Sequence, residues 1–328
     1  MSSRALLAGL GMLVAGLFMA SLAVGEASIP IGPALADIVA GRDSASAIIL
    51  RDLRLPRALL GVLVGGVLGL SGAAMQGLLR NPLAEPGVLG VSGFAALGAV
   101  LAFYTGLSAA APLALPFGGI AGALIAVMLL YALAGRAGLL TLLLAGAALN
   151  SLAGALIALA LNLAPSPYAI YEILFWLMGS LTDRSMAHVA LALPGIALGV
   201  GLLLSAGPAL DALSLGEDAA QSLGFDLASV RLRLVLGSAL AVGSAVAVSG
   251  AIGFVGLVVP HLVRQLAGRL PSRALVPAGL AGAALLLAAD IAVRLVPTGT
   301  ELKLGVLTSI VGAPFFLALV LRLRREAA

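Results

Sequence analysis

The chain has 328 residues, of which 62% are apolar and only 10% are charged, and its formal net charge is +4. A soluble domain is about half apolar and about a quarter charged, so this composition excludes a water-soluble fold. The mean hydropathy of +1.18 and the 42 glycines instead indicate helices that pack closely within a lipid bilayer.

Cysteine and histidine are too scarce for most metal or redox chemistry. The chain has no cysteine, which excludes disulfides and thiolate clusters, and only two histidines, His188 and His261. Its arginines are scattered over the polar connections instead of forming the basic patch that nucleic acid would need, so we interpret them as topology signals. We therefore expect no bound metal, no cofactor and no nucleic-acid partner.

Eight apolar segments are long enough to cross a membrane, which takes about 20 apolar residues. The segments are Ala5–Val24, Ala58–Leu79, Val88–Tyr104, Leu113–Ala134, Leu139–Leu161, Ala187–Ala206, Ala274–Val293 and Leu304–Leu321. The first could be mistaken for a signal peptide, but it exceeds the usual apolar region of one and many further spans follow. We interpret it as the first membrane helix.

A ninth segment, Leu234–Val263, is too long for one upright helix and short for two. Ser249–Gly253 predicts a break, and Pro260 would distort any helix that crossed it. Splitting there predicts an all-α integral membrane bundle of about ten helices with both termini on one side. The charge rule does not decide, because ten-span and nine-span topologies both place eleven of the 18 basic residues inside.

Three connections between the spans are longer than tight turns. Gly25–Leu55 is polar, Asn162–Met186 carries aromatic side chains suited to a membrane interface, and Gly207–Arg233 holds the densest acidic group. Within the last, Leu215–Gly224 predicts a short amphipathic helix ended by glycine, a natural handle for a soluble partner. An ordinary solvated loop explains the same residues equally well. The connector Asn81–Pro86 is rigid, because its two prolines fix φ.

The polar residues do not form an active site. No nucleophile stands near a base at a credible spacing, and we interpret His261 as a helix-end residue that bonds a carbonyl. A phosphate-binding loop needs a lysine after a glycine-rich turn, but Lys303, the one lysine, is flanked by leucines. We expect no enzyme activity, so ATP, if it drives the process, must bind another subunit.

Asp290 is an ionisable residue inside a predicted span, which makes it a functional candidate. A proton-relay role would make the chain a secondary transporter. The alternative is an ion pair with Arg294, four residues later and near the helix end, and we favour this structural interpretation.

Seven segments, taken in order, resemble the FecCD-type ABC permeases, which import iron–siderophores, haem and vitamin B12. The segments are Arg54–Arg57, Ser71–Gln76, Asn81–Ser92, Trp176–Ser180, Leu215–Gly224, Ser249–His261 and Gly312–Phe316. The resemblance runs from about residue 50 to the C-terminus. It implies a type II ABC importer permease, a single transmembrane domain over residues 1–328 with ten helices. Both termini would be cytoplasmic in the bacterial inner membrane, which favours ten spans over nine.

The same resemblance implies partners and the residues that meet them. A second copy of the chain, two cytoplasmic ATPase subunits and a periplasmic solute-binding protein would complete the transporter. Arg54, Arg57 and Arg294 match the outward arginines that dock the binding protein. The cytoplasmic segment of about residues 208–230 matches the ATPase-coupling region, with Glu217 and Asp218 as its charged contacts. The full set of matched coupling residues is Leu215, Gly216, Glu217, Asp218, Ala220, Gln221 and Gly224.

Two further segments match gate regions of the family. Asn81 and Leu83 resemble the region that closes the inner gate, and Leu139, Leu140 and Thr141 occupy the other gate region. Relatives often have small polar residues where this chain has the two leucines. Phe94 stands where relatives commonly continue a small-residue pattern, so we expect it to shape the adjacent pathway.

The resulting expectation is the permease subunit of an ATP-driven importer that moves a metal chelate, an iron–siderophore or haem, from a binding protein into the cytoplasm. A vitamin B12 or cobinamide importer of the same family is the first alternative. A secondary transporter coupled to protons through Asp290 is the second.

Overall fold

The structure is a computed structural model that describes residues 3–25, 27–111, 113–134, 138–164, 166–268, 270–296 and 302–327. All regular structure in these ranges is helical. The α-helices are α1 Ser3–Ala23, α2 Ile31–Val39, α3 Ala45–Ile48, α4 Leu55–Leu79, α5 Val91–Tyr104, α6 Leu107–Ala110, α7 Ala114–Ala134, α8 Leu139–Asn162, α9 Pro167–Leu177, α10 Met186–Ser205, α11 Gly207–Leu213, α12 Glu217–Ser222, α13 Leu227–Ser249, α14 Val255–Ala267, α15 Pro271–Leu295 and α16 Leu304–Ala327. A π-helical stretch, η1 Ile49–Arg54, precedes α4, and a short 3-10 helix, η2 Pro86–Leu89, precedes α5.

Eight helical segments in the described part of the chain are long and apolar enough to cross a membrane. They are α1, α4 with the preceding α3 and η1, α7, α8, α10, α13, α15 and α16. Two apolar helices are shorter, α5 with 14 residues and α14 with 13. At about 1.5 Å per residue each of these two reaches only about 20 Å, less than the hydrocarbon thickness of about 30 Å. The eight long segments and these two shorter apolar helices together make up the predicted all-α bundle of about ten membrane helices, which is confirmed.

The break predicted at Ser249–Gly253 is present. Helix α13 ends at Ser249, and α14 begins at Val255 after Gly250 and Phe254, whose φ angles of +71° and +66° lie in the left-handed region. The backbone N–H of Ser180 donates to the carbonyl of Ser249 at 2.7 Å, so the loop after α9 occupies the break.

Several connections are more ordered than the sequence predicts. Helix α13 begins at Leu227 instead of Leu234, because Asp226 caps it by accepting from the N–H groups of Ala228 and Ser229. The polar connection Gly25–Leu55 contains α2, α3 and η1, and α9 forms within Asn162–Met186. The predicted start of α13 was seven residues too late because the polar residues in its first turns resemble a connection.

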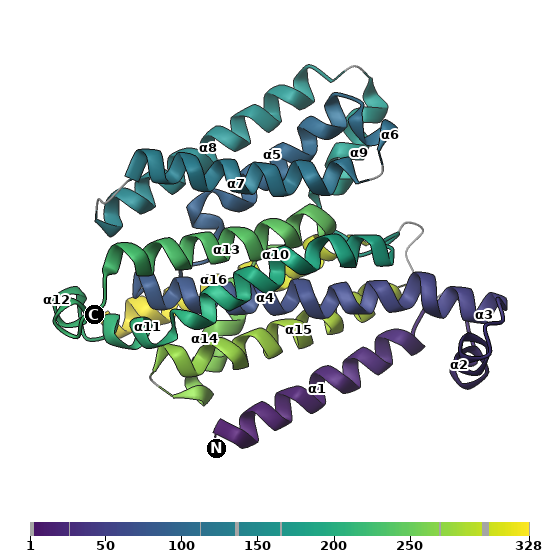
Figure 1. Cartoon of the computed structure of the whole chain (residues 1–328), viewed down its shortest axis with the longest axis horizontal. Coiled ribbons are helices and arrows are strands. Elements are labelled where there is room, and N and C mark those ends of the chain that lie inside the picture. Colours follow the sequence, from purple (N-terminus) through teal and green to yellow (C-terminus); the bar gives the residue numbers. More distant parts are fainter. Residues whose placement is uncertain are drawn as a thin grey trace.

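The two ends of the bundle carry different elements. The end of α16 lies beside α11 and α12 at one end, hereafter the inner end, and the start of α1 points toward the same end, while α2, α3, α6 and α9 lie at the opposite, outer end (Figure 1). The termini thus share one side, as expected for an even number of crossings.

Helices α4 and α15 form the most extensive contact between helices in the described part of the chain, and glycine makes it possible. A Cβ added at Gly65 would lie 2.4 Å from the carbonyl oxygen of Gly282, and one at Gly69 would lie 2.2 Å from that of Ala278. Small residues let membrane helices approach until their backbones touch. This pair, with α13 beside α4, forms the rigid centre that carries the polar residues described next.

Candidate transport and coupling sites

A buried ion-pair network joins α4 and α15 at the outer end of the bundle. Asp290 lies between Arg57, whose Nε is 2.9 Å from Oδ1, and Arg294, whose Nη2 is 2.8 Å from Oδ2. The three side chains are 2%, 14% and 7% exposed, respectively. The pair of Asp290 with Arg294 is the one that their four-residue spacing predicts. The partnership with Arg57, 233 residues away, was not foreseen.

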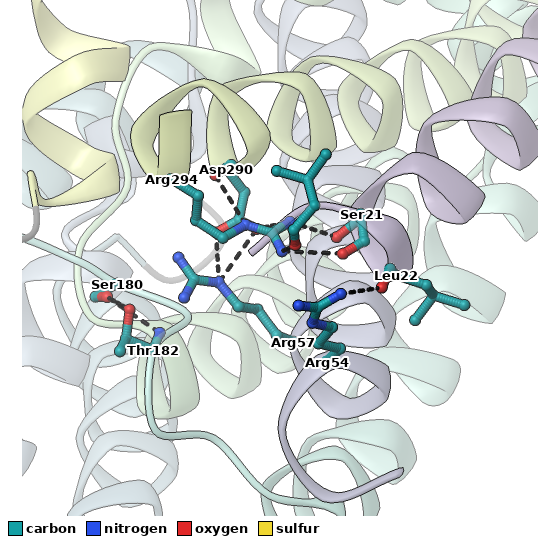
Figure 2. Close-up of polar contacts among 9 residues, drawn as sticks. Ser21, Leu22, Arg54, Arg57, Ser180, Thr182, Asp290 and Arg294 are labelled. Carbon is teal, nitrogen blue, oxygen red and sulfur yellow. Dashed lines mark hydrogen bonds and ion pairs between the residues drawn. The ribbon is translucent and has the colours of Figure 1, made fainter. Parts of the chain in front are cut away.

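Arg54 and Arg294 hold the end of α1 through its carbonyl groups (Figure 2). Arg54 Nη1 donates to the carbonyls of Leu22 and Ala23 at 2.8 Å, and Nη2 donates to the carbonyl of Ala27. Arg294 Nη1 donates to the carbonyls of Ser21 and Val24 at 2.9 and 2.7 Å, and Nη2 donates to Ser21 Oγ at 2.6 Å. The last carbonyls of a helix lack hydrogen-bond partners within it, and these guanidinium groups supply them. Their positive charge also interacts favourably with the negative end of the helix dipole.

The arginines predicted to dock a binding protein are therefore brought together, and all of them have partners within the chain. Arg54 is 6% exposed as a whole residue, so its guanidinium is enclosed in this single chain. Two guanidinium groups pair with the one carboxylate and the third, that of Arg54, bonds backbone carbonyls, so this site has more basic than acidic side chains.

The predicted coupling segment contains the expected short helix. Helix α12 starts after Gly216 and ends before Gly224. The φ of +88° at Gly224 is the left-handed conformation that a glycine commonly adopts just after a helix. Leu215 and Asp218 are exposed, whereas Ala220 is fully buried. Glu217 accepts from Arg231 on α13: one guanidinium nitrogen lies 2.9 Å from each carboxylate oxygen.

A second polar contact fixes the helix that precedes α12. Asp211 in α11 accepts from the backbone N–H and from the Oγ hydroxyl of Ser272, at 2.8 and 2.6 Å, in the first turn of α15. Arg231 was interpreted from the sequence only as a topology signal, and no role was predicted for Ser272. Asp211 and Ser272 are 61 residues apart along the chain, so no local sequence pattern indicates their contact.

The predicted gate residues lie in two segments toward the inner end. Asn81 follows α4 and accepts from the N–H of Leu83 at 2.9 Å, which tightens the proline-containing connector. Burial raises the pKa of the Glu85 carboxyl in this connector above its ordinary value. Leu139, Leu140 and Thr141 form the first turn of α8, where Leu140 is 71% exposed.

The short helix η2, which follows the connector, packs on the first half of α8, and this contact relates the two gate segments. A Cβ added at Gly146 of α8 would lie 2.4 Å from the carbonyl oxygen of Val88 in η2. Phe94, one turn into α5, is only 6% exposed and belongs to the main apolar core. In the single chain it fills space between helices.

His261 lies inside α14, so its expected place at a helix end is wrong. Its ring meets the ring of Phe315 edge-on, with centroids 6.0 Å apart, across the contact between α14 and α16. No cluster of three or more histidine or acidic side chains suited to a metal occurs among the described residues.

Two apolar cavities lie between the helices. One of about 600 Å³ is bordered by α1, α4 and α10, and another of about 290 Å³ by α14, α15 and α16. Both have carbon-rich linings, so neither offers polar groups to orient a charged chelate.

Comparison with known proteins places these features in a family. The model of the FecCD transport family matches residues 12–322. The chain is 40% identical over 274 residues to the vitamin B12 import system permease protein BtuC of Vibrio cholerae, covering 83% of this chain and 82% of that protein. It is 42% identical over 290 residues to the hemin transport system permease protein HmuU of Yersinia pestis, covering 84% of each.

A solved structure has the same fold. It is described as an inward-facing conformation of a metal-chelate type ABC transporter, and it superposes with a TM-score of 0.86 at 32% identity. The match covers 97% of this chain and 99% of that one, so it includes the broken helix α13–α14 and the coupling segment.

Proposed function

This chain belongs to the FecCD transport family, and from that premise we propose that it forms the membrane passage of an ATP-driven importer for a metal chelate. The observation that carries the proposal is similarity along most of the chain to permeases named for vitamin B12 and for hemin. These cargoes share a flat macrocycle that holds a metal, so the proposed substrate class is a metal chelate of that size. Haem or an iron–siderophore is the first candidate, and cobalamin or cobinamide is the alternative that the BtuC relatives favour.

The proposed complex contains a second copy of this chain, two ATPase subunits and a solute-binding protein. The sequence has no phosphate-binding loop, so the ATPase is a separate subunit, and the exposed helix α12 is the proposed point of attachment. Since α12 and both termini share one end of the bundle, that end is proposed to be cytoplasmic. The two large cavities described above are apolar, and the proposed passage therefore lies between two copies of the chain.

The outer end is proposed to receive the binding protein through the surface that surrounds Arg54, Arg57 and Arg294. The excess of guanidinium groups over the carboxylate of Asp290 supports this role, because a positive surface attracts and orients an acidic partner. Their contacts with the end of α1 would hold that surface in shape. The inner gate is proposed to involve Asn81 and Leu83 together with Leu139, Leu140 and Thr141.

The proton-coupled alternative finds no support in the surroundings of Asp290. Two guanidinium groups lie within 2.9 Å of its carboxylate and join it to both α4 and α15, which supports a structural role for Asp290.

Uptake by proteoliposomes that contain the permease with its own ATPase and binding protein would test the proposal. Labelled haem, a ferric siderophore and cobalamin are offered in turn, with ATP inside or outside and with an imposed proton gradient as a separate condition. We expect accumulation of one chelate class only when ATP is supplied on the side of α12. Uptake driven by the proton gradient without ATP would overturn the proposal.

A further inference from the structure

Helix α12 is set apart from its neighbours by a glycine at each end. Gly216 has φ of +117° and Gly224 has φ of +88°, conformations that other residues rarely adopt, and an added Cβ would meet nothing within 4 Å at either position. Leu215 and Leu223 beside these glycines are 72% and 61% exposed. Ala220, a small side chain, is the one buried residue of α12, so little apolar packing opposes rotation about these two glycines.

Helix α11, by contrast, is fixed to the bundle. The Asp211 carboxylate accepts from the N–H and from the hydroxyl of Ser272, at the positive end of the α15 dipole. Its residues Leu210 and Leu213 are buried. Within the coupling segment, α11 is therefore anchored to the bundle, whereas α12 has few contacts that hold it in place.

A single polar contact bridges that movable part to the membrane bundle. Among the residues that the structure describes, the bond of Glu217 to Arg231 is the one side-chain hydrogen bond from α12 to another helix. Arg231 is 16% exposed and Glu217 37%. One nitrogen of Arg231 donates to both carboxylate oxygens, and such charge-assisted bonds are roughly twice as strong as neutral ones.

We propose that the Glu217–Arg231 pair is a strut that transmits the movement of α12 to α13, which makes Glu217 a positioning residue and not a contact for the ATPase. This inference rests on the proposed function, in which α12 receives movement from that subunit. Asp218 is exposed next to Glu217 and is the carboxylate that faces a partner.

The path of α13 through the bundle explains how the Glu217–Arg231 pair could act at a distance. Helix α13 is 23 residues long and lies at the centre of the bundle, where it packs against α4, α7 and α10. Its far end is the break at Gly250, where Ser249 bonds the loop after α9. A force applied near Arg231 would therefore reach the outer half of the bundle through one rigid helix. Without the strut, rotation about Gly216 and Gly224 would absorb the same force.

The first test measures the strut itself, in the full-length permease without partners. Amide hydrogen exchange over residues 217–225 is compared between the wild type, Glu217→Gln and the charge-swapped double variant Glu217→Arg with Arg231→Glu. Arg233→Gln is the matched control, because Arg233 lies two residues along the same helix, is partly exposed, and bonds only the carbonyl of Ser229 at 3.4 Å among the contacts described. We expect exchange to rise about fivefold or more in Glu217→Gln, since opening now lacks the strut. It should return toward the wild-type value in the swapped pair and stay unchanged in Arg233→Gln.

The second test uses the complete transporter and measures three quantities: ATPase retained on the permease, ATP hydrolysed, and chelate accumulated per ATP. We expect Glu217→Gln to retain the ATPase but to lower accumulation per ATP about fivefold, the low end of typical coupling between sites. The swapped pair should recover most of that loss. Asp218→Asn should instead reduce the amount of ATPase retained.

Two results would overturn the strut. One is a loss of retained ATPase in Glu217→Gln that the swapped pair does not repair, which makes Glu217 a contact residue. The other is unchanged exchange and unchanged accumulation per ATP in Glu217→Gln. If the wild type neither retains an ATPase nor accumulates a chelate, the proposed function fails, and the exchange experiment still decides whether the pair restrains α12.

Discussion

Helices α4 and α1 have similar hydropathy but opposite environments. In the most apolar stretch of each, 78% of the residues of the α4 segment are buried within the protein, but only 17% of those of α1. Lipid tails are as apolar as leucine, so hydropathy detects the membrane and does not distinguish the protein interior from the lipid surface. Glycines in close contact and ion pairs mark the interior instead.

The largest effect should follow from enlarging a glycine in the α4–α15 contact. Gly65→Leu places a side chain where the backbone of Gly282 lies 2.4 Å from an added Cβ, and neither backbone can yield. We expect no correctly folded protein, seen as loss of the monodisperse peak in size-exclusion chromatography of detergent extracts. Gly16→Leu in α1, where an added Cβ meets nothing within 4 Å, is the matched control and should purify normally. If both variants purified equally well, α4 would not be more tightly packed than α1, and the contrast between the two helices would be wrong.

Next in size is the loss of the carboxylate that two arginines share. Asp290→Ala removes the counter-charge of Arg57 and Arg294, and breaking a buried pair in this way costs about 3–5 kcal/mol. We expect a clear fall in the melting temperature of the purified permease. Asp37→Ala breaks the exposed pair with Arg42 and should cost about 1 kcal/mol or less. A similar fall in both variants would argue against a buried network.

The sequence predicted the centre less well than the membrane crossings. Runs of apolar residues located the spans, and Ser249–Gly253 located the break, because both signals are local. The pairing of Arg57 with Asp290 joins residues far apart in the chain, so no spacing rule reaches it. The same holds for the contact of Arg294 with the end of α1.

At the candidate sites, too, the sequence identified residues better than their partners. The short helix before Gly224 was predicted correctly from its pattern. The start of α13 was not, since Arg231 and Arg233 resembled a polar connection, although a helix that emerges from a membrane often carries such residues in its first turns. Glu217 was assigned to a partner protein through the resemblance to the family's coupling region, and no local pattern indicated its bond to Arg231.

One contact of α16 should behave like the centre even though only 28% of the most apolar stretch of this helix is buried. A Cβ added at Gly312 would lie 2.3 Å from the Cβ of Phe254, so Gly312→Ala should cost about 1–3 kcal/mol. Phe254→Gly removes the opposing Cβ and suits the φ of +66° at that position. In the Phe254→Gly background, Gly312→Ala should therefore lower the melting temperature much less than it does alone. An equal decrease in both backgrounds would show that the two positions do not meet.

The smallest effect should come from α1, where the exposed Met12 has the same chemistry as a buried methionine of α4. Met12 is 71% exposed and Met75 is fully buried. Truncating Met12 exchanges contacts with lipid for other contacts with lipid, so Met12→Ala should change stability by no more than about 0.5 kcal/mol. Met75→Ala leaves a cavity and should cost about 2–5 kcal/mol. Melting temperatures of the two variants in the same lipid nanodiscs measure this difference, and a large loss in Met12→Ala would mean that this face of α1 packs against protein in the assembled transporter.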